Sequence, residues 1–335
     1  GIPLTSDYIQ TFLDRRKPGQ SKFTTARKES DSVEILSGVF EGYTTGTPIS
    51  LIVRNTDQRS HDYSKIKDCY RPGHADYTFD QKYGVRDYRG GGRTSGRETI
   101  GRVAGGAIAC RILEALGIHL TTYTKAIGPF SIPSDAYDYS AINENRLYMP
   151  NQKYAEQASA YLESCIRKQD SSGGLIECMI HGMPSGIGEP VFNKLDAALA
   201  KAVMSIGAVK GVEIGDGFSV VSSKGSKNND SFFAENGQIY KLTNHSGGIL
   251  GGLSDGSTIL LRAAIKPTPS ISQPQKTVNT NGENIKIEIS GRHDPVIVPR
   301  AVVVVESMAA VTLVDLLMQN MSSRIEYMKQ VYLGI

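Results

Sequence analysis

Apolar residues recur at helical spacing in several segments of the chain. Ser6–Arg16 places Tyr8, Ile9, Phe12 and Leu13 on one face of a helix, and a Pro-Gly pair follows shortly after it. The same spacing predicts further helices over Glu98–Leu116, Tyr154–Lys168 and Val191–Ile206, and the segment Pro295–Gln330 is expected to end in a long helix. The segment Glu98–Leu116 is rich in glycine and alanine, so another backbone can approach it closely.

Shorter apolar runs, bounded by glycine, proline and polar residues, predict strands between these helices. The predicted strands are Val33–Phe40, Pro48–Asn55, Leu175–Gly182, Lys210–Val221 and Thr258–Ile265. Glycines predict a kink within Lys210–Val221 and a turn at Glu41–Thr47, whereas Asn55–Asp76 is polar and irregular. The chain therefore mixes helices and strands without a clear linker or a low-complexity tail.

One segment differs from the pattern of a packed core. Residues Arg71–Arg97 read RPGHADYTFDQKYGVRDYRGGGRTSGR and combine a high density of arginine with one histidine and three consecutive glycines. Arginines this close repel one another unless an anion lies among them, and glycines let the backbone approach a bulky ligand. The helix predicted next directs its free N–H groups and its dipole toward the same loop. These features predict a pocket for a multiply charged molecule that carries phosphate.

Composition limits the possible functions. The 335 residues are 39% hydrophobic and 21% charged, as in soluble globular proteins, and the net charge of +3 is too small for a generic polyanion binder. No apolar run approaches the roughly 20 residues of a membrane-spanning helix, and no signal peptide is evident, so we expect a cytoplasmic protein. The four cysteines form no CxxC pair and no HExxH cluster occurs. We therefore expect reduced structural thiols and no metal site.

At RPGHADYTFDQKYGVRDYRGGGR the sequence resembles the chorismate synthase family, in its bacterial monofunctional form. Further blocks agree and occur in the family's order along nearly the whole chain. They are LDRRKPG at Leu13–Gly19, TPISLIVRNTDQRSHDY at Thr47–Tyr63, KGVEIGDGF at Lys210–Phe218, NHSGGILGGLS at Asn244–Ser254, KPTPSI at Lys266–Ile271 and GRHDP at Gly291–Pro295.

The resemblance implies an α+β fold: a β-α-β sandwich with helices packed between antiparallel sheets, in a single domain over residues 1–335. A looser similarity between Arg97–Leu116 and Arg300–Leu317, both arginine-led and rich in small residues, leaves open two pseudo-equivalent halves. The family is usually homotetrameric. Its members also begin with a few dozen more residues, in which a Gly-Glu-Ser-His-Gly block supplies one of two active-site histidines. We therefore expect this chain to be an N-terminally truncated form.

The implied activity is that of a phosphate lyase. Members of the family convert 5-enolpyruvylshikimate-3-phosphate to chorismate plus phosphate by an anti 1,4-elimination, the last common step of the shikimate pathway for aromatic amino-acid biosynthesis. The reaction requires reduced FMN (FMNH2) without net redox change. Because the chain carries no nicotinamide-binding motif, an external NAD(P)H-dependent flavin reductase is the implied source of reduced flavin.

The resemblance also implies roles for individual residues. His74 matches the second active-site histidine, which delivers a proton to the reduced flavin or polarises it. Asp294 matches an aspartate that assists removal of the substrate's C6 proton near flavin N5, while the role of His293 stays open. The positions that match substrate-binding residues are Arg16, Lys22, Arg71, Arg97 and Arg292. Relatives often have arginine where Lys22 stands.

The positions that match FMN-binding residues are Arg93, Thr94, Ser95, Gly207, Ala208, Gly251, Lys266, Pro267, Thr268, Pro269, Ser270 and Arg292. Two alternatives to the lyase stay open. A nucleic-acid-binding module could use the arginine and glycine loop Arg86–Arg97, but the small net charge and interleaved acidic residues argue against it. A truncated, non-catalytic FMN-binding assembly subunit would bind flavin without turnover.

Overall fold

A five-stranded antiparallel sheet forms one layer of the protein. The structure is a computed structural model that describes residues 1–24, 30–55, 67–88, 92–289 and 294–334. The strand order is β6-β5-β7-β13-β8. The strands are β6 (Phe130–Ser131), β5 (His119–Ile127), β7 (Gly174–His181), β13 (Ile259–Ile265) and β8 (Val209–Ile214).

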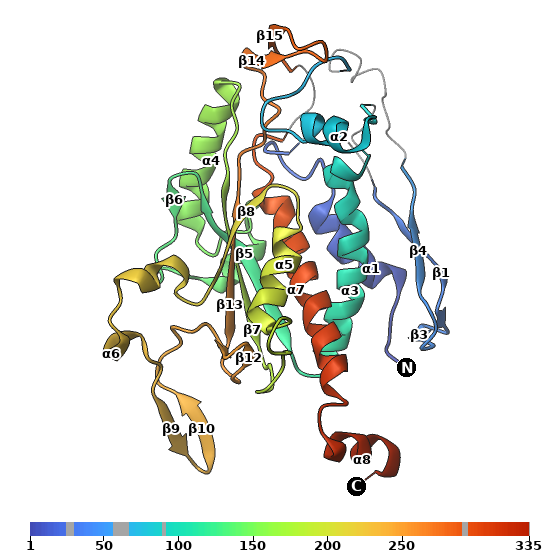
Figure 1. Cartoon of the computed structure of the whole chain (residues 1–335), viewed down its shortest axis with the longest axis vertical. Coiled ribbons are helices and arrows are strands. Elements are labelled where there is room, and N and C mark those ends of the chain that lie inside the picture. The colour runs from blue at the N-terminus through green and yellow to red at the C-terminus, as the bar shows by residue number, and fades with distance from the viewer. Residues whose placement is uncertain (25–29, 56–66, 89–91, 290–293, 335) are drawn as a thin grey trace.

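Helices cover one face of this sheet and separate it from a second, smaller layer of strands (Figure 1). The helices against the sheet are α3 (Thr99–Ala115), α5 (Leu195–Met204) and α7 (Val298–Asn320). Beyond them, α1 (Ser6–Arg16) packs on α3 and α7 and carries the antiparallel ribbon of β1 (Val33–Ser37) and β4 (Ser50–Val53). This arrangement confirms the predicted α+β sandwich with helices between antiparallel sheets.

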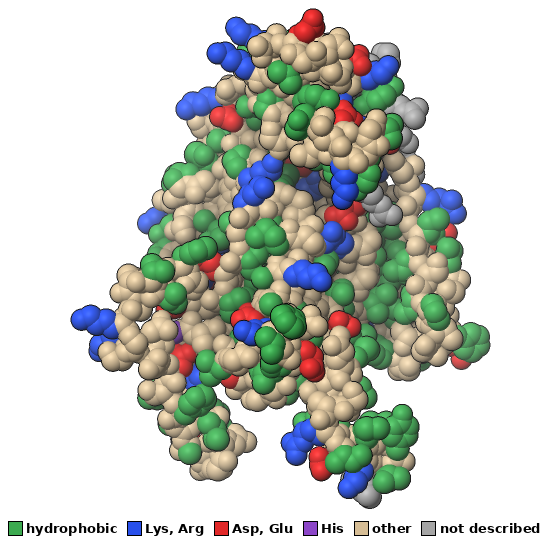
Figure 2. Space-filling model, in the orientation of Figure 1, with side chains coloured by type: hydrophobic (Ala, Val, Ile, Leu, Met, Phe, Trp, Pro, Cys, Tyr) green, Lys and Arg blue, Asp and Glu red, His purple; other side chains and the backbone are tan. Residues whose placement is uncertain are grey.

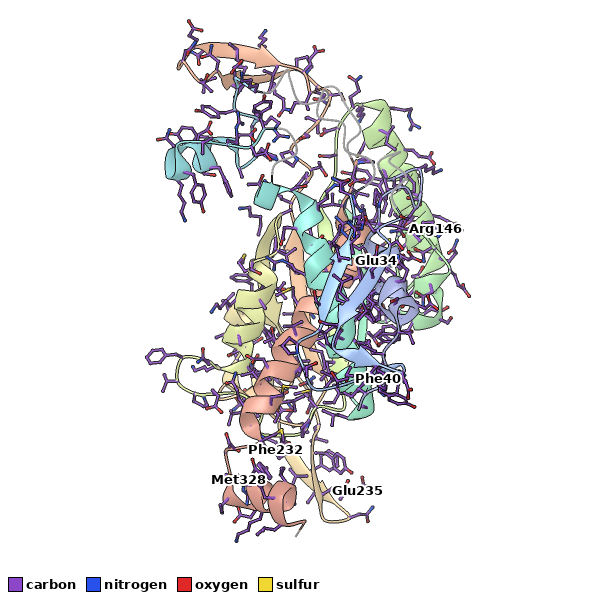
Figure 3. All side chains as sticks on the ribbon, turned by 90° about the vertical axis from the view of Figure 1, so that its right-hand side faces the viewer. Glu34, Phe40, Arg146, Phe232, Glu235 and Met328 are labelled. Atoms are coloured by element: carbon purple, nitrogen blue, oxygen red, sulfur yellow. The ribbon has the colours of Figure 1, made fainter. Side chains whose placement is uncertain are left out.

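Peripheral elements surround these layers. They are α2 (Asp76–Tyr83), α4 (Gln152–Arg167), α6 (Gly225–Asn228), α8 (Ile325–Leu333), η2 (Gly92–Thr94), η3 (Gly96–Glu98), η4 (Tyr139–Asn143), η5 (Gly217–Ser222), β2 (Val39–Phe40), β3 (Tyr43–Thr44), β9 (Phe232–Glu235), β10 (Gln238–Lys241), β11 (Ile249–Leu250), β12 (Leu253–Ser254), β14 (Gln275–Val278) and β15 (Asn284–Ile287). The β9–β10 hairpin and α8 project from one end, where Figure 3 labels Phe232, Glu235 and Met328.

Small residues allow α3 and α7 to approach closely. A Cβ atom built on Gly106 would lie 2.1 Å from Cβ of Ser307, so only glycine fits at this position. Ser307 is fully buried, and its hydroxyl donates to the carbonyl of Val303 at 2.7 Å. The small residues predicted to admit another backbone therefore do so at the centre of the core. By length and composition α7 could also cross a membrane, but 67% of its apolar window is buried inside the protein.

Several predicted elements have different ends. Helix α1 matches its prediction residue for residue, and Thr5 caps it by accepting a hydrogen bond from the N–H of Tyr8 at 3.2 Å. In contrast, the long helix expected at the end of Pro295–Gln330 is followed by a break, because α7 ends at Asn320 and α8 begins at Ile325. The serines between them bond back to the carbonyls of the last turn, which competes with helix continuation.

Three other predictions need correction. The helix predicted from Val191 begins four residues later, at Leu195. The strand predicted over Lys210–Val221 ends at Ile214, and the 3-10 helix η5 begins at Gly217. The strand predicted over Val33–Phe40 breaks at Gly38, whose φ of +82° interrupts the extended backbone. All four cysteines are free and buried, as expected.

Candidate active site

Arg16 joins the end of α1 to the start of α3. Its guanidinium donates to Asp31 Oδ2 at 2.8 Å, to Thr99 Oγ1 at 3.1 Å and to the carbonyl of Gly96 at 2.9 Å. The side chain is 3% exposed. Burial, followed by the neighbouring charge of Arg300, lowers the pKa of Arg16 to about 10. This predicted substrate-binding arginine therefore holds the loop that precedes α3 and adds positive charge there.

The first turn of α7 adds a second arginine to this region. Arg300 donates from Nε to the carbonyl of Arg16 at 2.8 Å and pairs through Nη1 with Asp294 Oδ2 at 2.5 Å. Arg97, just before α3, lies close enough to Arg16 for its charge to oppose protonation there. Arg97 at the start of α3 and the Arg300–Asp294 pair at the start of α7 thus both lie close to Arg16.

His74 belongs to a cluster around one carboxylate. Asp76, the first residue of α2, is 3% exposed. Its carboxylate lies 2.7 Å from Nε of Arg71, 2.8 Å from Nδ1 of His74 and 3.0 Å from Nη1 of Arg86. Burial alone would raise the pKa of Asp76, but hydrogen bonds from Arg71 and His74, and the charges of both, hold it well below its usual range. The carboxyl is therefore ionised.

The loop after β13 connects this cluster to the sheet. Nζ of Lys266 donates to the carbonyl of Gly73 at 2.5 Å, and its backbone N–H donates to the carbonyl of Ala208 at 2.9 Å. Burial and the charge of Lys210 lower the pKa of Lys266. These bonds bring the predicted residues at 71–74, 207–208 and 266–270 side by side.

The backbone around Ala208 has unusual features. Ala208 has a φ of +76°, which residues other than glycine rarely adopt. A Cβ atom added to Gly207 would meet nothing within 4 Å, so this backbone is open on the side where a ligand could lie. The hydroxyl of Thr268, two residues after Lys266, is buried without a hydrogen-bond partner among the described residues. Such an orphaned polar atom is uncommon and marks a place for a ligand atom or a water.

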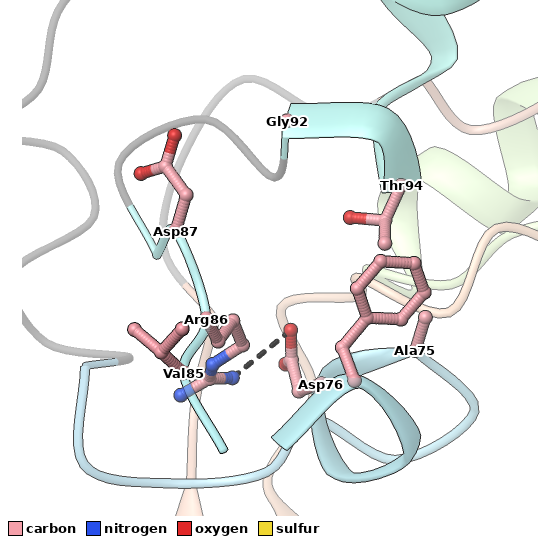
Figure 4. A pocket seen from close by; sticks show the side chains of 8 residues that line it. Ala75, Asp76, Val85, Arg86, Asp87, Gly92 and Thr94 are labelled. Atoms are coloured by element: carbon pink, nitrogen blue, oxygen red, sulfur yellow. Dashed lines mark ion pairs between the residues drawn. The ribbon is translucent and has the colours of Figure 1, made fainter. Parts of the chain in front are cut away.

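A small hollow separates α2 from the loop before α3. Its volume is about 90 Å³, and its lining includes Asp76, Phe79, Arg86 and Thr94 (Figure 4). Thr94 therefore lies beside the His74 cluster, because it lines the same hollow as Asp76 and Arg86. Figure 2 shows lysine and arginine side chains around the hollowed region between α2 and the helical layer. The site is therefore cationic and lies at the starts of α3 and α7, where helix dipoles also favour an anion.

The structure does not bring every predicted residue to this site. Lys22 is 65% exposed and its ammonium pairs with Glu163 of α4. Gly251 lies in the β11–β12 turn, and its neighbour Gly252 accepts a hydrogen bond from Leu195 at the start of α5. Gly207 follows the other end of α5, about 15 Å away along a helix of ten residues. Arg292, His293 and the side chain of Arg93 lie outside the described residues.

Three residues of the site were not predicted from the sequence. Asp76 and Arg86 belong to the His74 cluster, and Arg300 holds Asp294. The signal for Asp76 was its position two residues after His74 at a helix start, and Arg300 led the segment that resembles Arg97–Leu116. Among the described residues, no group of histidine, cysteine and carboxylate side chains could hold a metal ion.

The fold and the site together define an α+β protein with a cationic pocket at convergent helix starts between antiparallel sheets. A family model described as chorismate synthase matches residues 1–318. A chorismate synthase of Lachnoclostridium phytofermentans is 64% identical over 333 residues, which are 99% of this chain and 91% of that protein. One from Paramagnetospirillum magneticum is 50% identical over 324 residues, 96% of this chain and 90% of that protein.

A solved structure agrees with these relatives. A crystal structure titled as chorismate synthase superimposes with a TM-score of 0.75 at 29% identity, covering 98% of this chain and 88% of that one. The chain therefore belongs to the chorismate synthase family.

Proposed function

We propose that this protein is a phosphate lyase that converts 5-enolpyruvylshikimate-3-phosphate to chorismate and phosphate by anti 1,4-elimination, in the shikimate pathway. The observation that carries the proposal is the convergence of family-matched residues from six separate segments on one cationic site. That substrate carries a phosphate and two carboxylates, which suit arginine and helix starts. Arg97 and Arg71 are the proposed anion contacts, and Arg16 and Arg300 add charge behind them.

The residues after β13 fit a bound FMN. The orphaned hydroxyl of Thr268, the ammonium of Lys266 and the buried hydroxyl of Ser270 offer polar partners for phosphate or ribityl oxygens, and the open backbone at Gly207 suits a flat ring. Reduced FMN would supply electron density to the substrate as its phosphate leaves. The protein's contribution is to orient the substrate, to neutralise its charge and to exclude water.

Two side chains are proposed to handle protons. His74 lies in the cluster with Arg71 and Asp76 and is 19% exposed, so it is reachable from the site. Asp294 is 9% exposed and is held by Arg300, which fixes its orientation for assisting removal of the C6 proton. The two residues come from different segments and therefore can serve different proton transfers.

The proposal includes the setting of the enzyme. We propose a cytoplasmic homotetramer that obtains reduced FMN from an external NAD(P)H-dependent reductase. The relatives named chorismate synthase support the enzyme and its pathway, and the high identity over nearly the whole chain supports a shared substrate. Neither nucleic acid nor membrane is a proposed partner.

An anaerobic assay tests the proposal. Purified protein is mixed with photoreduced FMN and 5-enolpyruvylshikimate-3-phosphate, and chorismate and phosphate are followed together. Equal release of both, abolished when the flavin is oxidised, is the expected result. Saturable FMN binding without product would favour the non-catalytic assembly subunit. Absence of both binding and product would overturn the proposed lyase.

A further inference from the structure

Asp76 contacts three cationic or protonatable side chains at once. Arg71 approaches both carboxylate oxygens, with Nε 2.7 Å from Oδ2 and Nη2 2.9 Å from Oδ1. Nδ1 of His74 and Nη1 of Arg86 share Oδ1, at 2.8 and 3.0 Å. The carboxylate also accepts the backbone N–H of Arg71 at 3.1 Å. A buried carboxylate with this many donors is strongly fixed in place.

The contacts of His74 Nδ1 select one position for the ring proton. Nδ1 lies 2.8 Å from the Asp76 carboxylate and 3.0 Å from Nη2 of Arg71. It can donate to the carboxylate or accept from the arginine, but not both. Asp76 is ionised, and a hydrogen bond to a charged acceptor is the stronger of the two. The proton therefore lies on Nδ1, and Nε2 is the nitrogen that can exchange a proton with a ligand.

The same carboxylate also determines what Arg71 can do. A guanidinium binds external anions best through its two-nitrogen fork. In Arg71 the fork formed by Nε and Nη2 faces Asp76. Arg71 can therefore offer its Nη1 edge to a ligand, in an orientation that Asp76 sets.

We propose that Asp76 is a positioning residue for the lyase reaction: it keeps the proton of His74 on Nδ1, so that Nε2 serves the proton transfer, and it fixes the orientation of Arg71. The inference rests on the proposed function for its catalytic consequence. Its structural part, the position of the proton on His74, can be tested without any turnover.

Solid-state NMR of the whole protein tests the structural part. Histidines are labelled with ¹³C and ¹⁵N, and the signals of His74 are identified by their loss in His74→Ala. We expect Nδ1 of His74 to be protonated in the unsubstituted protein. An unprotonated Nδ1 in the unsubstituted protein overturns the proposal.

The variant Asp76→Asn adds a directional prediction. Without the carboxylate, Nδ1 should accept from Arg71 Nη2, which already lies 3.0 Å away, so the proton moves to Nε2. The matched control is Asp80→Asn, which removes the same charge from the next turn of α2. Asp80 lies 3.8 Å from Nε of Arg86, so its ion pair is with that arginine and not with His74 or Arg71. The control should keep Nδ1 protonated; a proton that stays on Nδ1 in Asp76→Asn contradicts the proposal.

Kinetics test the catalytic part. Asp76→Asn should lower kcat by roughly 10- to 100-fold, because general acid–base catalysis is typically worth 100-fold or more and depends on the correct tautomer. In the His74→Ala background the same substitution should have a much smaller effect, since both changes disable one function. Equal losses in both backgrounds would show that Asp76 acts independently of His74 and overturn the proposal. An unsubstituted protein without lyase activity would instead refute the proposed function, while the NMR result would still decide the position of the proton.

Discussion

Arg15 of α1 donates two hydrogen bonds of 2.8 Å to the two carboxylate oxygens of Glu306 in α7. Glu306 is 8% and Arg15 28% exposed. Burial alone would lower the pKa of Arg15, but the charge and hydrogen bonds of Glu306 outweigh it and raise that pKa. The pair joins two helices that carry Arg16 and Arg300 at neighbouring positions of the site. It therefore links the stability of the helical layer to the geometry of the cationic pocket.

Glu306→Gln should destabilise the fold by about 2–3 kcal/mol, because it leaves the Arg15 guanidinium without its counter-charge. The loss should be smaller than for a fully buried pair, because Arg15 is partly exposed. Urea unfolding at one fixed protein concentration measures it. The control Glu34→Gln removes an exposed partner of Arg54 at 3.5 Å and should change stability by less than about 1 kcal/mol. Equal effects of the two substitutions would contradict the assigned role of the pair.

Gly106→Ala should destabilise the protein by about 2 kcal/mol, because the added methyl group would lie 2.1 Å from Cβ of Ser307 and force α3 and α7 apart. Gly105→Ala is a matched control in the same helix, since its Cβ would meet nothing within 4 Å. That control should be neutral or stabilise the fold by up to about 1 kcal/mol, because alanine favours helix. Thermal unfolding compares the two, and the reverse order of stability would refute the packing argument.

Much of the fold could be predicted from the sequence, because helices such as α1 and α3 have strong apolar periodicity and clear ends. The nine-residue strand β5 was not predicted. Its residues His119–Ile127 include three threonines and a lysine, and its fit depends on pairing with β6 and β7 rather than on its own pattern. Helix α2 was missed for a similar reason, since Asp76 is its only buried residue.

The candidate site was predicted by ordered motifs rather than by spacing. Their positions within the motifs identified His74, Arg97 and Lys266 as site residues. In the structure these residues lie at one end of the helical layer. Motif position could not show which arginines are committed to protein partners. Arg16 matches an anion contact in sequence, and in the structure three of its N–H groups donate to Asp31, Thr99 and Gly96. Only three-dimensional packing distinguishes a guanidinium that supports a loop from one that faces a ligand.

Asp230 lies at the base of the β9–β10 hairpin, and its ionisation should make the stability of the protein depend on pH. Burial would raise its pKa, but hydrogen bonds from the backbone N–H groups of Ser246 and His245 and from the Thr243 hydroxyl hold it well below the usual range. A depressed carboxyl pKa stabilises the fold above the unfolded-state pKa of about 3.9, and this stabilisation is lost as pH falls toward the folded-state value.

Asp230→Asn should therefore lower the urea midpoint most at pH 7. The difference from the unsubstituted protein should shrink as the pH is lowered from about 5 toward 2. Lys241 lies 3.3 Å from Asp230, and it also has Asp255 as a partner at 2.7 Å, so its charge stays partly compensated in the variant. A difference that stays constant across this pH range would show that the hydrogen bonds, and not the ionised carboxylate, stabilise the hairpin base.

Thr268→Val should separate stability from FMN binding. The Thr268 hydroxyl is buried without a partner in the part of the chain that the structure describes, so replacing it by a methyl group removes an unsatisfied polar atom. We expect the ligand-free protein to be unchanged or up to about 1 kcal/mol more stable. If the hydroxyl binds FMN, affinity for FMN should fall by about 5- to 10-fold, the worth of one hydrogen bond. Thermal unfolding and fluorescence titration with FMN measure the two effects.

The nearby hydroxyl of Ser171 provides the control for Thr268. It donates to the backbone carbonyl of Thr268 at 2.7 Å and so supports the loop that follows β13. Ser171→Ala should therefore lower stability, by about 1 kcal/mol, and change FMN affinity less than Thr268→Val does. Opposite signs for the stability changes of the two variants would indicate that the fold leaves the Thr268 hydroxyl unpaired for a ligand. Loss of stability in Thr268→Val with unchanged FMN affinity would instead indicate a water or protein partner for this hydroxyl, and the proposed FMN contact at this residue would be wrong.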